Sequence, residues 1–252
     1  MNSPVWTSQD LSANPHAVAD KARRVEQMFA AIARSYDLNN RVHSLGRDQA
    51  WRRATVRMAQ VRSGETILDV ACGTGDLAMA FARTEAARVI GIDFTYNMLA
   101  VAHRKLADLQ GRRHAPLSYH AGDAMRLPIA DSSVDVVSIA FGIRNVANPA
   151  AAMAEFHRVL RPGGRVIILE FSTPTQPILR NLYNFYFHHI MPRTASWIAR
   201  DRSGAYKYLP RSVNTFIDRT AMMSMMHDAG FTETHHQPLT FGIAVAYRGI
   251  KP

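Results

Sequence analysis

Short apolar runs alternate with amphipathic stretches through the middle of the chain. The runs at 67–70, 88–92, 134–143 and 165–169 are rich in Val and Ile, which predicts buried strands. The stretches between them repeat apolar residues at helical spacing. Strands that alternate with helices are typical of a parallel sheet with crossover helices, so we predict an α/β fold.

The pattern differs on either side of this region. Residues 12–62 look helical, with one apolar stripe that predicts a flank or lid, interrupted by a polar turn at 36–40. After residue 172 two prolines interrupt the chain, and an aromatic and His-rich segment follows at 183–191. A helix is predicted from about 219 to 229. The last stretch, 242–251, alternates as a closing strand does, and we expect it to be antiparallel.

Turn and cap residues mark the ends of several elements. Gly111 is expected to stop the helix that follows Asp93, and Asn148 with Pro149 to begin the next one as cap and first residue. The segment 161–164, Arg-Pro-Gly-Gly, is predicted to turn the chain before the fifth strand. We therefore expect one domain with three parts: a flank at 12–62, a core at 63–172, and further helices and closing strands at 173–252.

Composition limits the class of protein. With 252 residues and 47% apolar content, the chain can form one large core. The single cysteine, Cys72, excludes an intrachain disulfide and fits a cytoplasmic protein. No signal peptide or membrane-spanning run is apparent, so we expect a soluble protein. The net charge of +10 fits a nucleic acid, an anionic membrane surface or solubility alone, and no RNA-reading motif favours the first.

The most informative motif is the turn at 69–76, Asp-Val-Ala-Cys-Gly-Thr-Gly-Asp, which follows an apolar run. Gly73 and Gly75 allow a tight turn against which a nucleotide-type ligand can lie. The motif also fits the loose dinucleotide pattern. Asp69 is an awkward neighbour for a pyrophosphate and a good one for the sulfonium and ammonium of S-adenosylmethionine, which we therefore favour. A capped strand end with no ligand is the third interpretation.

Two more carboxylates follow predicted strands. Asp93 ends the second strand, where an acidic residue can accept hydrogen bonds from ribose hydroxyls. Asp123 follows the third strand and could accept from an adenine amino group, while Ala124 leaves room for the ring. Each could instead be an ordinary turn residue. Together with Asp69 they are expected to meet, because strand ends of an open α/β sheet converge on one crevice.

These residues resemble the class I adenosylmethionine-dependent methyltransferases, and more narrowly the UbiE/MenG/COQ5 family. Three further segments carry the narrower resemblance: Tyr-Asp-Leu-Asn-Asn-Arg-Val-His-Ser-Leu-Gly at 36–46 with Trp51, Phe-Gly-Ile-Arg-Asn-Val at 141–146, and Arg-Val-Leu-Arg-Pro-Gly-Gly at 158–164 leading to Glu-Phe-Ser at 170–172. The chain departs from the family in having Asn39 for a frequent Met, Asp48 for His, Arg161 for Lys and Ala140 for Ser.

The resemblance implies a Rossmann-like, mostly parallel seven-stranded sheet with a C-terminal antiparallel strand and helices on both faces. It implies methylation of a ring carbon of demethylmenaquinol or of a ubiquinone precursor, both prenylated quinols. S-adenosylmethionine is the expected cofactor, and no metal or nucleic acid is expected. Peripheral attachment to the inner face of the membrane, a quinone-biosynthesis complex or a homo-oligomer would fit. The expected cofactor-binding residues are Asp69, Gly73, Thr74, Gly75, Asp93, Asp123, Ala124 and Ala140.

The chemistry needs a group that stabilises a phenolate. Arg144 is the first candidate, because it follows the fourth strand and should face the methyl donor, although a guanidinium is a poor base. The alternative is a buried Arg paired with a carboxylate. Asn145 could orient the substrate or cap a turn. The residues expected to face the substrate are Tyr36, Asn40, Tyr186 and His188.

Two rival functions use the same fold. An RNA methyltransferase would account for the basic charge, although no appended RNA-binding module is apparent. A non-catalytic scaffold would have no need of the carboxylates and glycines that ring the crevice.

Overall fold

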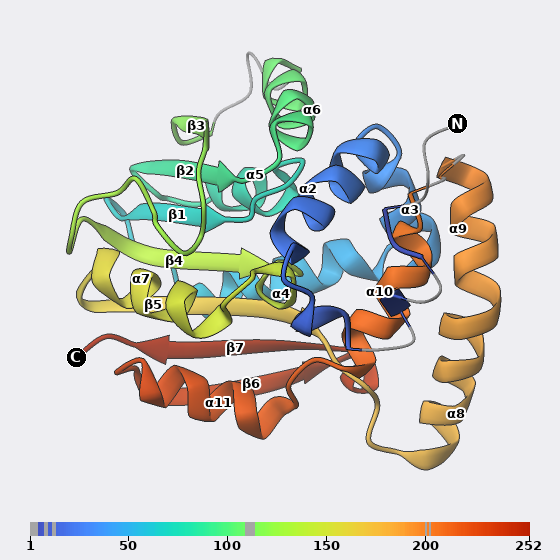
Figure 1. Cartoon of the computed structure of the whole chain (residues 1–252). Coiled ribbons are helices and arrows are strands. Elements are labelled where there is room, and N and C mark those ends of the chain that lie inside the picture. The colour runs from blue at the N-terminus through green and yellow to red at the C-terminus, as the bar shows by residue number, and fades with distance from the viewer. Residues whose placement is uncertain (1–4, 8–9, 12–13, 109–113, 200, 202) are drawn as a thin grey trace.

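The computed structural model describes the chain except residues 1–4, 8–9, 12–13, 109–113, 200 and 202 (Figure 1). The expected start of the flank near residue 12 and the expected helix stop at Gly111 lie outside the described residues.

The centre of the protein is one seven-stranded sheet in the order β3-β2-β1-β4-β5-β7-β6 (Figure 1). The first five strands run parallel, and β7 runs antiparallel to both of its neighbours. The predicted fold class, a mostly parallel sheet with a C-terminal antiparallel strand, is confirmed. The strands are β1 (Thr66–Val70), β2 (Arg88–Asp93), β3 (Leu117–Ala121), β4 (Val134–Ala140), β5 (Leu160–Phe171), β6 (Thr232–Leu239) and β7 (Ala244–Ile250).

The central strands are apolar on both faces because helices cover both. In β1, Leu68 belongs to the core on one face, with Met153 of α7 and Met222 of α11. Ile67, one position earlier, belongs to the core on the other face, with Phe81 of α5. This alternation follows from the two-residue repeat of a strand. The covering helices are α5 (Asp76–Ala82), α6 (Tyr96–Ala107), α7 (Pro149–Val159) and α11 (Arg219–Asp228).

Local sequence explains where some of these helices begin and end. The Asn148 side chain accepts a hydrogen bond of 3.1 Å from the backbone N–H of Ala151, and Pro149 is the first residue of α7, as predicted. Gly230, at φ +93°, follows α11, because a glycine takes this left-handed conformation without steric cost. The predicted closing strand at 242–251 is β7, and its antiparallel direction is confirmed.

The segment 161–164 corrects one prediction. It was expected to be a turn before the fifth strand, but β5 already begins at Leu160. The pairing of β4 with β5 shifts its register between Val134 and Val136, and Gly163 has φ +76°. Gly163 and Gly164 also exchange backbone hydrogen bonds with Lys251. The Pro-Gly-Gly sequence is therefore an irregularity within β5 and not a turn before it. The sequence did not show this, because the segment is held by hydrogen bonds to the distant C-terminal end of the chain.

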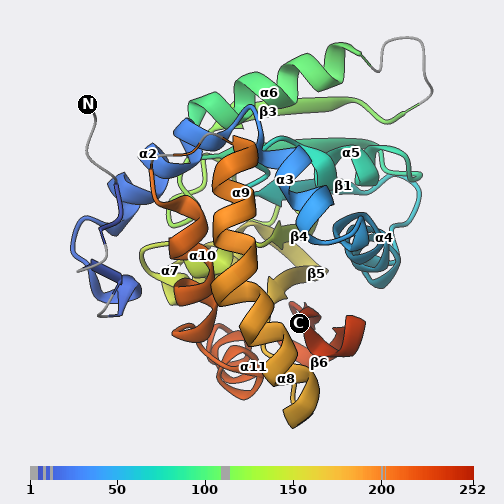
Figure 2. The same cartoon turned by 90° about the vertical axis from the view of Figure 1, so that its right-hand side faces the viewer.

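Helices from both flanks lie across the carboxyl edge of the sheet (Figures 1 and 2). In Figure 2, α9 and α8 run across the front, beside α10, α2 and α3. These elements are η1 (Pro15–Ala17), α2 (Lys21–Ile32), α3 (Tyr36–His43), α8 (Pro177–Phe185), the π-helical turn η3 (Tyr186–Ile190), α9 (Met191–Ala199) and α10 (Ala205–Asn214). The helix α4 (Arg47–Ala59) follows α3 and packs on a face of the sheet, against β5, β7 and α5. No helix among the described residues is long and apolar enough to cross a membrane.

The flank is helical as predicted, but its break lies elsewhere. The polar segment at 36–40 was expected to be a turn, yet Tyr36 begins α3, and the interruption falls at 33–35. The Asn39 amide donates to the backbone oxygen of Ser35 at 3.3 Å, four residues earlier. Asp37 accepts hydrogen bonds from residues on α6 and in the glycine turn. These contacts stabilise a helix that local propensity alone disfavours.

Candidate active site

The site is at the carboxyl ends of the neighbouring strands β1 and β4. The chain leaves these two strands in opposite directions, and an open α/β sheet forms a crevice at such a point. The turn after β1 has Gly73 at φ +56° and Gly75 at φ +83°. A Cβ on Gly75 would lie 2.1 Å from the hydroxyl of Tyr119, so only glycine fits there. A Cβ on Gly73 would meet nothing within 4 Å, so that position borders open space. Gly75 thus shapes the turn, and Gly73 borders the crevice.

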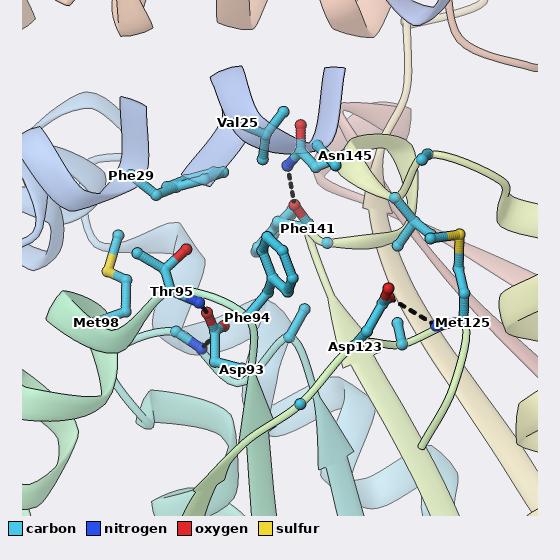
Figure 3. A pocket seen from close by; sticks show the side chains of 18 of the residues that line it. Val25, Phe29, Asp93, Phe94, Thr95, Met98, Asp123, Met125, Phe141 and Asn145 are labelled. Carbon is cyan, nitrogen blue, oxygen red and sulfur yellow. Dashed lines mark hydrogen bonds between the residues drawn. The ribbon is translucent and has the colours of Figure 1, made fainter. Parts of the chain in front are cut away.

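A first cavity, of about 110 Å³, lies above this turn (Figure 3). We call it the crevice cavity. Its floor is formed by the ends of β1, β2 and β4, and its roof by Val25 and Phe29 of α2. The expected cofactor-binding residues that line it are Gly73, Asp93, Asp123, Ala124 and Ala140.

Asp93 organises one side of the crevice cavity. Its carboxylate accepts hydrogen bonds from the backbone N–H groups of Gly73, at 2.7 Å, and Thr95, at 2.8 Å. Burial raises the pKa of Asp93, while these N–H groups favour the charged form. On the other side, Asp123 accepts from the backbone N–H of Met125 at 2.9 Å (Figure 3). Each carboxylate keeps lone pairs for a ligand, because a carboxylate can accept about four hydrogen bonds.

Asp69 lies beneath the turn, in a small pocket that adjoins the crevice cavity and also contains Arg52 and Thr74. One carboxylate oxygen accepts from the Ser138 hydroxyl at 2.7 Å, and the other, Oδ2, is buried without a partner among the described residues. Burial raises the pKa of Asp69 to about 7. A buried carboxylate with a free oxygen is suited to a cationic ligand, which would restore its charged form.

The N-terminal flank is tied to the glycine turn by side-chain contacts. The Thr74 hydroxyl donates to the Asp37 carboxylate at 2.5 Å. Lys105 of α6 donates to Asp37 at 2.7 Å and also to Asp76, the first residue of α5. The Gln49 amide of α4 donates to Asp76 at 3.0 Å. This network holds α3 and α4 against the turn that borders the crevice.

A second cavity, of about 410 Å³, opens beside the first. We call it the apolar cavity. Helices of both flanks form its wall, with aromatic residues such as Trp51, Tyr183 and Phe187. Its size and lining are those of a small-molecule site. The two cavities share three residues of their wall, Phe29, Tyr36 and Phe141.

Arg144 belongs to the 3-10 turn η2 (Ile143–Asn145) that follows β4, and it lines the apolar cavity. Its guanidinium forms a buried ion pair with Glu170, at 2.5 Å, and donates to the backbone oxygen of Phe141 at 2.9 Å. Burial raises the pKa of Glu170, and the charge of Arg144 opposes this. The buried pair that was the alternative interpretation of Arg144 therefore exists, in the wall of a cavity.

Asn145 is held in a fixed orientation at the rim of the crevice cavity. Its amide donates to the Phe141 oxygen at 3.2 Å, and its carbonyl accepts from the Tyr208 hydroxyl at 3.0 Å. Lys21 of α2 donates to the backbone oxygens of Arg144 and Val146, at 2.9 and 2.6 Å. The turn that carries Arg144 and Asn145 is thus fixed from two sides.

The structure brings together most of the residues predicted from sequence. Tyr36, Asn40 and Tyr186 line the apolar cavity, and Tyr36 borders both cavities. His188 is a correction: it was expected to face the substrate, but it is exposed, lines neither cavity and pairs with Asn214 at 2.8 Å.

Sequence reasoning missed three residues of the site. Glu170 and His43 belong to the segments that carry the family resemblance but had no predicted role, and Arg52 was not predicted to belong to the site. The signal for His43 was available once 36–43 is helical, because Tyr36, Asn40 and His43 then share one face. Nothing in the sequence alone pairs Glu170 with Arg144.

The seven-stranded order, the glycine turn and the carboxylates at strand ends define a class I adenosylmethionine-dependent methyltransferase. A model of the ubiE/COQ5 methyltransferase family matches residues 17–251, and the chain belongs to this family. The family and the fold imply the use of S-adenosylmethionine.

Relatives and solved structures agree with this assignment. The chain is 41% identical over 238 residues to the ubiquinone/menaquinone biosynthesis C-methyltransferase UbiE of Geobacter sp. (strain M21), covering 94% of this chain and 100% of that protein. It is 42% identical to the demethylmenaquinone methyltransferase of Deinococcus radiodurans, covering 92% and 94%.

Among solved structures, a SAM-dependent methyltransferase of Thermotoga maritima is similar with a TM-score of 0.62 at 18% identity, over 90% of this chain and 100% of that one. A phosphoethanolamine N-methyltransferase of Haemonchus contortus, solved with S-adenosylhomocysteine, has a TM-score of 0.55 at 16% identity, over 76% and 50%. These two similarities support the fold.

Proposed function

We propose that this enzyme transfers a methyl group from S-adenosylmethionine to a ring carbon of a prenylated hydroquinol, demethylmenaquinol or the corresponding ubiquinone precursor. The observation that carries the proposal is the shared wall of the two cavities at Phe29, Tyr36 and Phe141. One cavity offers carboxylates for a nucleoside, and the other offers an apolar volume of about 410 Å³ for a ring. Adjoining cavities would place the two ligands side by side, and methyl transfer needs their reacting atoms in direct contact, about 3–3.5 Å apart.

The residues of the crevice fit the cofactor. Asp93 would accept hydrogen bonds from the ribose hydroxyls, and Asp123 from the adenine amino group, with Ala124 and Ala140 leaving space for the ring. The free oxygen of Asp69 would accept from the ammonium group. Gly73 leaves open space, so that a ligand can lie against the backbone there. When bound, the cofactor supplies an electrophilic methyl group on a sulfonium.

The chain itself must hold the quinol and stabilise negative charge on its oxygen. Arg144 is in the wall of the apolar cavity and stays protonated. A guanidinium there stabilises a phenolate, and the phenolate raises electron density at the ortho carbon. Glu170 holds the guanidinium in place through the pair at 2.5 Å. Tyr36, in the wall that the two cavities share, would restrict the orientation of the ring, and Asn145 would do so from the rim of the crevice cavity.

The prenyl tail needs an apolar exit. Leu45 lines the apolar cavity and is 89% exposed, so an apolar side chain reaches the surface at its mouth. Other large apolar residues are exposed on α3, α8, η3 and α9, and α3 contacts α9. With Leu45 they form what we call the apolar patch: Leu38, Val42, Leu45, Ile178, Leu182, Phe185, Ile190 and Trp197.

The apolar patch has exposed basic residues on the same helices, Arg180 on α8 and Arg193 on α9. An apolar surface with nearby cations is suited to the interface of an anionic bilayer. We infer that the protein is cytoplasmic and binds the inner face of the membrane through this patch, where the tail of its substrate lies. The net charge of +10 supports such attraction.

A deletion strain tests the function in the cell. Quinones extracted from cells that lack this chain should contain demethylmenaquinone or a demethylated ubiquinone precursor, as identified by mass spectrometry. Restoring the wild-type chain should restore the methylated quinone. An unchanged quinone profile, together with the loss of a methyl mark on ribosomal or transfer RNA, would favour the rival function.

A further inference from the structure

The wall of the apolar cavity contains buried polar atoms that have no hydrogen-bond partner among the described residues. Asn39 Oδ1, His43 Nε2 and the Tyr183 hydroxyl are in this state, and all three residues line the cavity. Most buried polar groups in proteins are paired. A concentration of unpaired groups around one cavity indicates that a ligand with hydroxyl groups supplies the partners.

His43 is the one group among these that can take up a proton near neutral pH. It lies on α3, four residues after Asn39, so both side chains lie on one face of the helix. Residues of α3, η3 and α9 surround this part of the cavity.

The Tyr186 hydroxyl contacts both the ring and the backbone of His43. The Tyr186 hydroxyl donates its single proton to the backbone oxygen of His43, at 3.3 Å. The same hydroxyl lies 3.0 Å from His43 Nδ1, and with its proton used it accepts there. In this arrangement Nδ1 carries the ring proton and Nε2 presents a lone pair, and this is the tautomer that the proposal below uses. A tautomer fixed by a neighbouring group is a common feature of catalytic histidines.

Burial lowers the pKa of His43, so the ring is neutral at physiological pH. A neutral imidazole can accept a proton without first losing one. Arg144, in the wall of the same cavity, carries the positive charge that a developing phenolate needs. The base and the charge-stabilising group are thus separate residues.

We propose that His43 Nε2 is the general base that removes the hydroxyl proton of the quinol; this inference rests on the proposed function. The O–H bond breaks and its proton goes to Nε2, while the electron pair stays on the quinol as a phenolate. The ortho carbon then uses an electron pair of the ring to form the new bond to the methyl group. The sulfur–methyl bond breaks at the same time, and the electron pair of that bond stays on sulfur. The ring hydrogen at that carbon leaves as a proton to solvent, which restores the aromatic ring. The imidazolium returns its proton to the oxygen.

The test compares two variants of the whole enzyme. In His43→Asn the side-chain amide can still donate to Tyr186 from the position of Nδ1, but nothing replaces Nε2. His227→Asn, at an exposed histidine of α11, is the matched control. Two quantities are measured: the dissociation constant of demethylmenaquinol in the presence of S-adenosylhomocysteine, and the rate of a single turnover with S-adenosylmethionine.

Loss of a general base should slow the single turnover of His43→Asn by about 10²- to 10⁴-fold. Quinol affinity should change by less than about threefold, since binding and proton removal are separate contributions. Added imidazole should restore part of the rate of His43→Asn and leave the control unchanged. His43→Gln, which keeps the volume, provides the same comparison if the Asn variant does not fold.

Two results would overturn the proposal. One is a single-turnover rate within about threefold of wild type in a folded variant. The other is an equal loss of rate and quinol affinity without rescue by imidazole, which would make His43 structural. If the wild-type enzyme itself does not methylate the quinol, the proposed function fails, and this outcome is distinct from failure of the role of His43.

Discussion

Arg144 and Glu170 form a buried ion pair of 2.5 Å in the wall of the apolar cavity. The two residues are 26 positions apart. Arg144 lies in η2, which follows β4, and Glu170 lies in β5; the pairing of β4 with β5 brings them together. Buried pairs of this kind contribute little net stability, but they fix the position of a charge. We therefore interpret the pair as the means of holding a guanidinium beside the quinol oxygen.

The first prediction concerns Arg144. Arg144→Ala should lower turnover by about 10²- to 10³-fold, because the phenolate loses its stabilising charge. The affinity for S-adenosylmethionine should stay within about threefold, since Arg144 does not line the crevice cavity. Titration calorimetry and quinol turnover measure the two quantities. Arg144→Lys, which keeps the charge but loses the planar fork, should be intermediate. An equal fall in affinity and turnover would instead make Arg144 structural.

The second prediction concerns Asp93. Asp93→Asn should weaken S-adenosylmethionine binding by roughly 10- to 100-fold through loss of charge-assisted hydrogen bonds to ribose. Asn is the milder substitution, because it keeps one of the two oxygens that accept from the backbone N–H groups of Gly73 and Thr95, whereas Ala removes both. Asp93→Ala would disturb the turn as well, and its thermal unfolding should show this. A dissociation constant equal to that of wild type would contradict the ribose assignment.

The third prediction is a pH dependence that originates in Asp69. Its pKa of about 7 in the free protein is raised by burial, so the carboxyl group is largely protonated at pH 5. The ammonium of the cofactor favours the charged form, and binding therefore releases a proton. Affinity should rise from pH 5 to about 7, by at most about tenfold per unit, and level off above.

Asp69→Asn should remove the slope. Calorimetry in buffers of different ionisation enthalpy would detect the proton, and a flat wild-type profile would exclude this role.

The same shift has a consequence for stability. A carboxyl group whose pKa is higher in the folded state than in the unfolded state binds more protons when folded. Its contribution to stability is present below the unfolded pKa, near 4, and is lost as pH rises through about 7. The thermal stability of the free protein should therefore include a contribution that decreases as pH rises from about 4 to about 7, and the Asp69→Asn variant should lack this decrease.

The fourth prediction concerns the apolar patch. Trp197 is 82% exposed on α9, and burying a Trp side chain at a bilayer interface is favourable. Trp197→Ser combined with Leu182→Ser should reduce co-sedimentation with vesicles of phosphatidylglycerol by at least about fivefold. Tyr96→Ser, at an exposed aromatic residue of α6 outside the patch, is the control. Equal binding of both variants, or no binding of wild type, would refute membrane contact through this surface.

The strands and the crevice could be predicted from sequence because their causes are local. Successive side chains of a strand point to opposite faces, and helices cover both faces of this sheet, so a strand appears in the sequence as a mostly apolar run such as 67–70. Residues such as Asp69 and Asp93 lie near the ends of these runs. The topology of a parallel sheet then brings those ends together without knowledge of any single contact.

The remaining features depend on contacts between distant parts of the chain. Residues 36–40 read as a turn because Asp and Asn disfavour helices, but Asp37 meets Thr74 and Lys105 in the folded protein. His188 and His43 could not be ranked from sequence, since only packing decides which histidine lines the cavity. Glu170 could not be predicted as the partner of Arg144 either, because a pattern along the chain does not show which carboxylate contacts a guanidinium.

Methyl transfer in vitro tests the central claim most directly. The purified protein is incubated without oxygen with chemically reduced demethylmenaquinone and S-adenosylmethionine that carries a deuterated methyl group, and the quinone is then analysed by mass spectrometry. We predict a product with one deuterated methyl group on a ring carbon, with an Arg144→Ala reaction that is slower by about 10²-fold or more. Absence of label in this quinone and in a demethylated ubiquinone precursor, from a protein that binds S-adenosylmethionine, would contradict the proposed function.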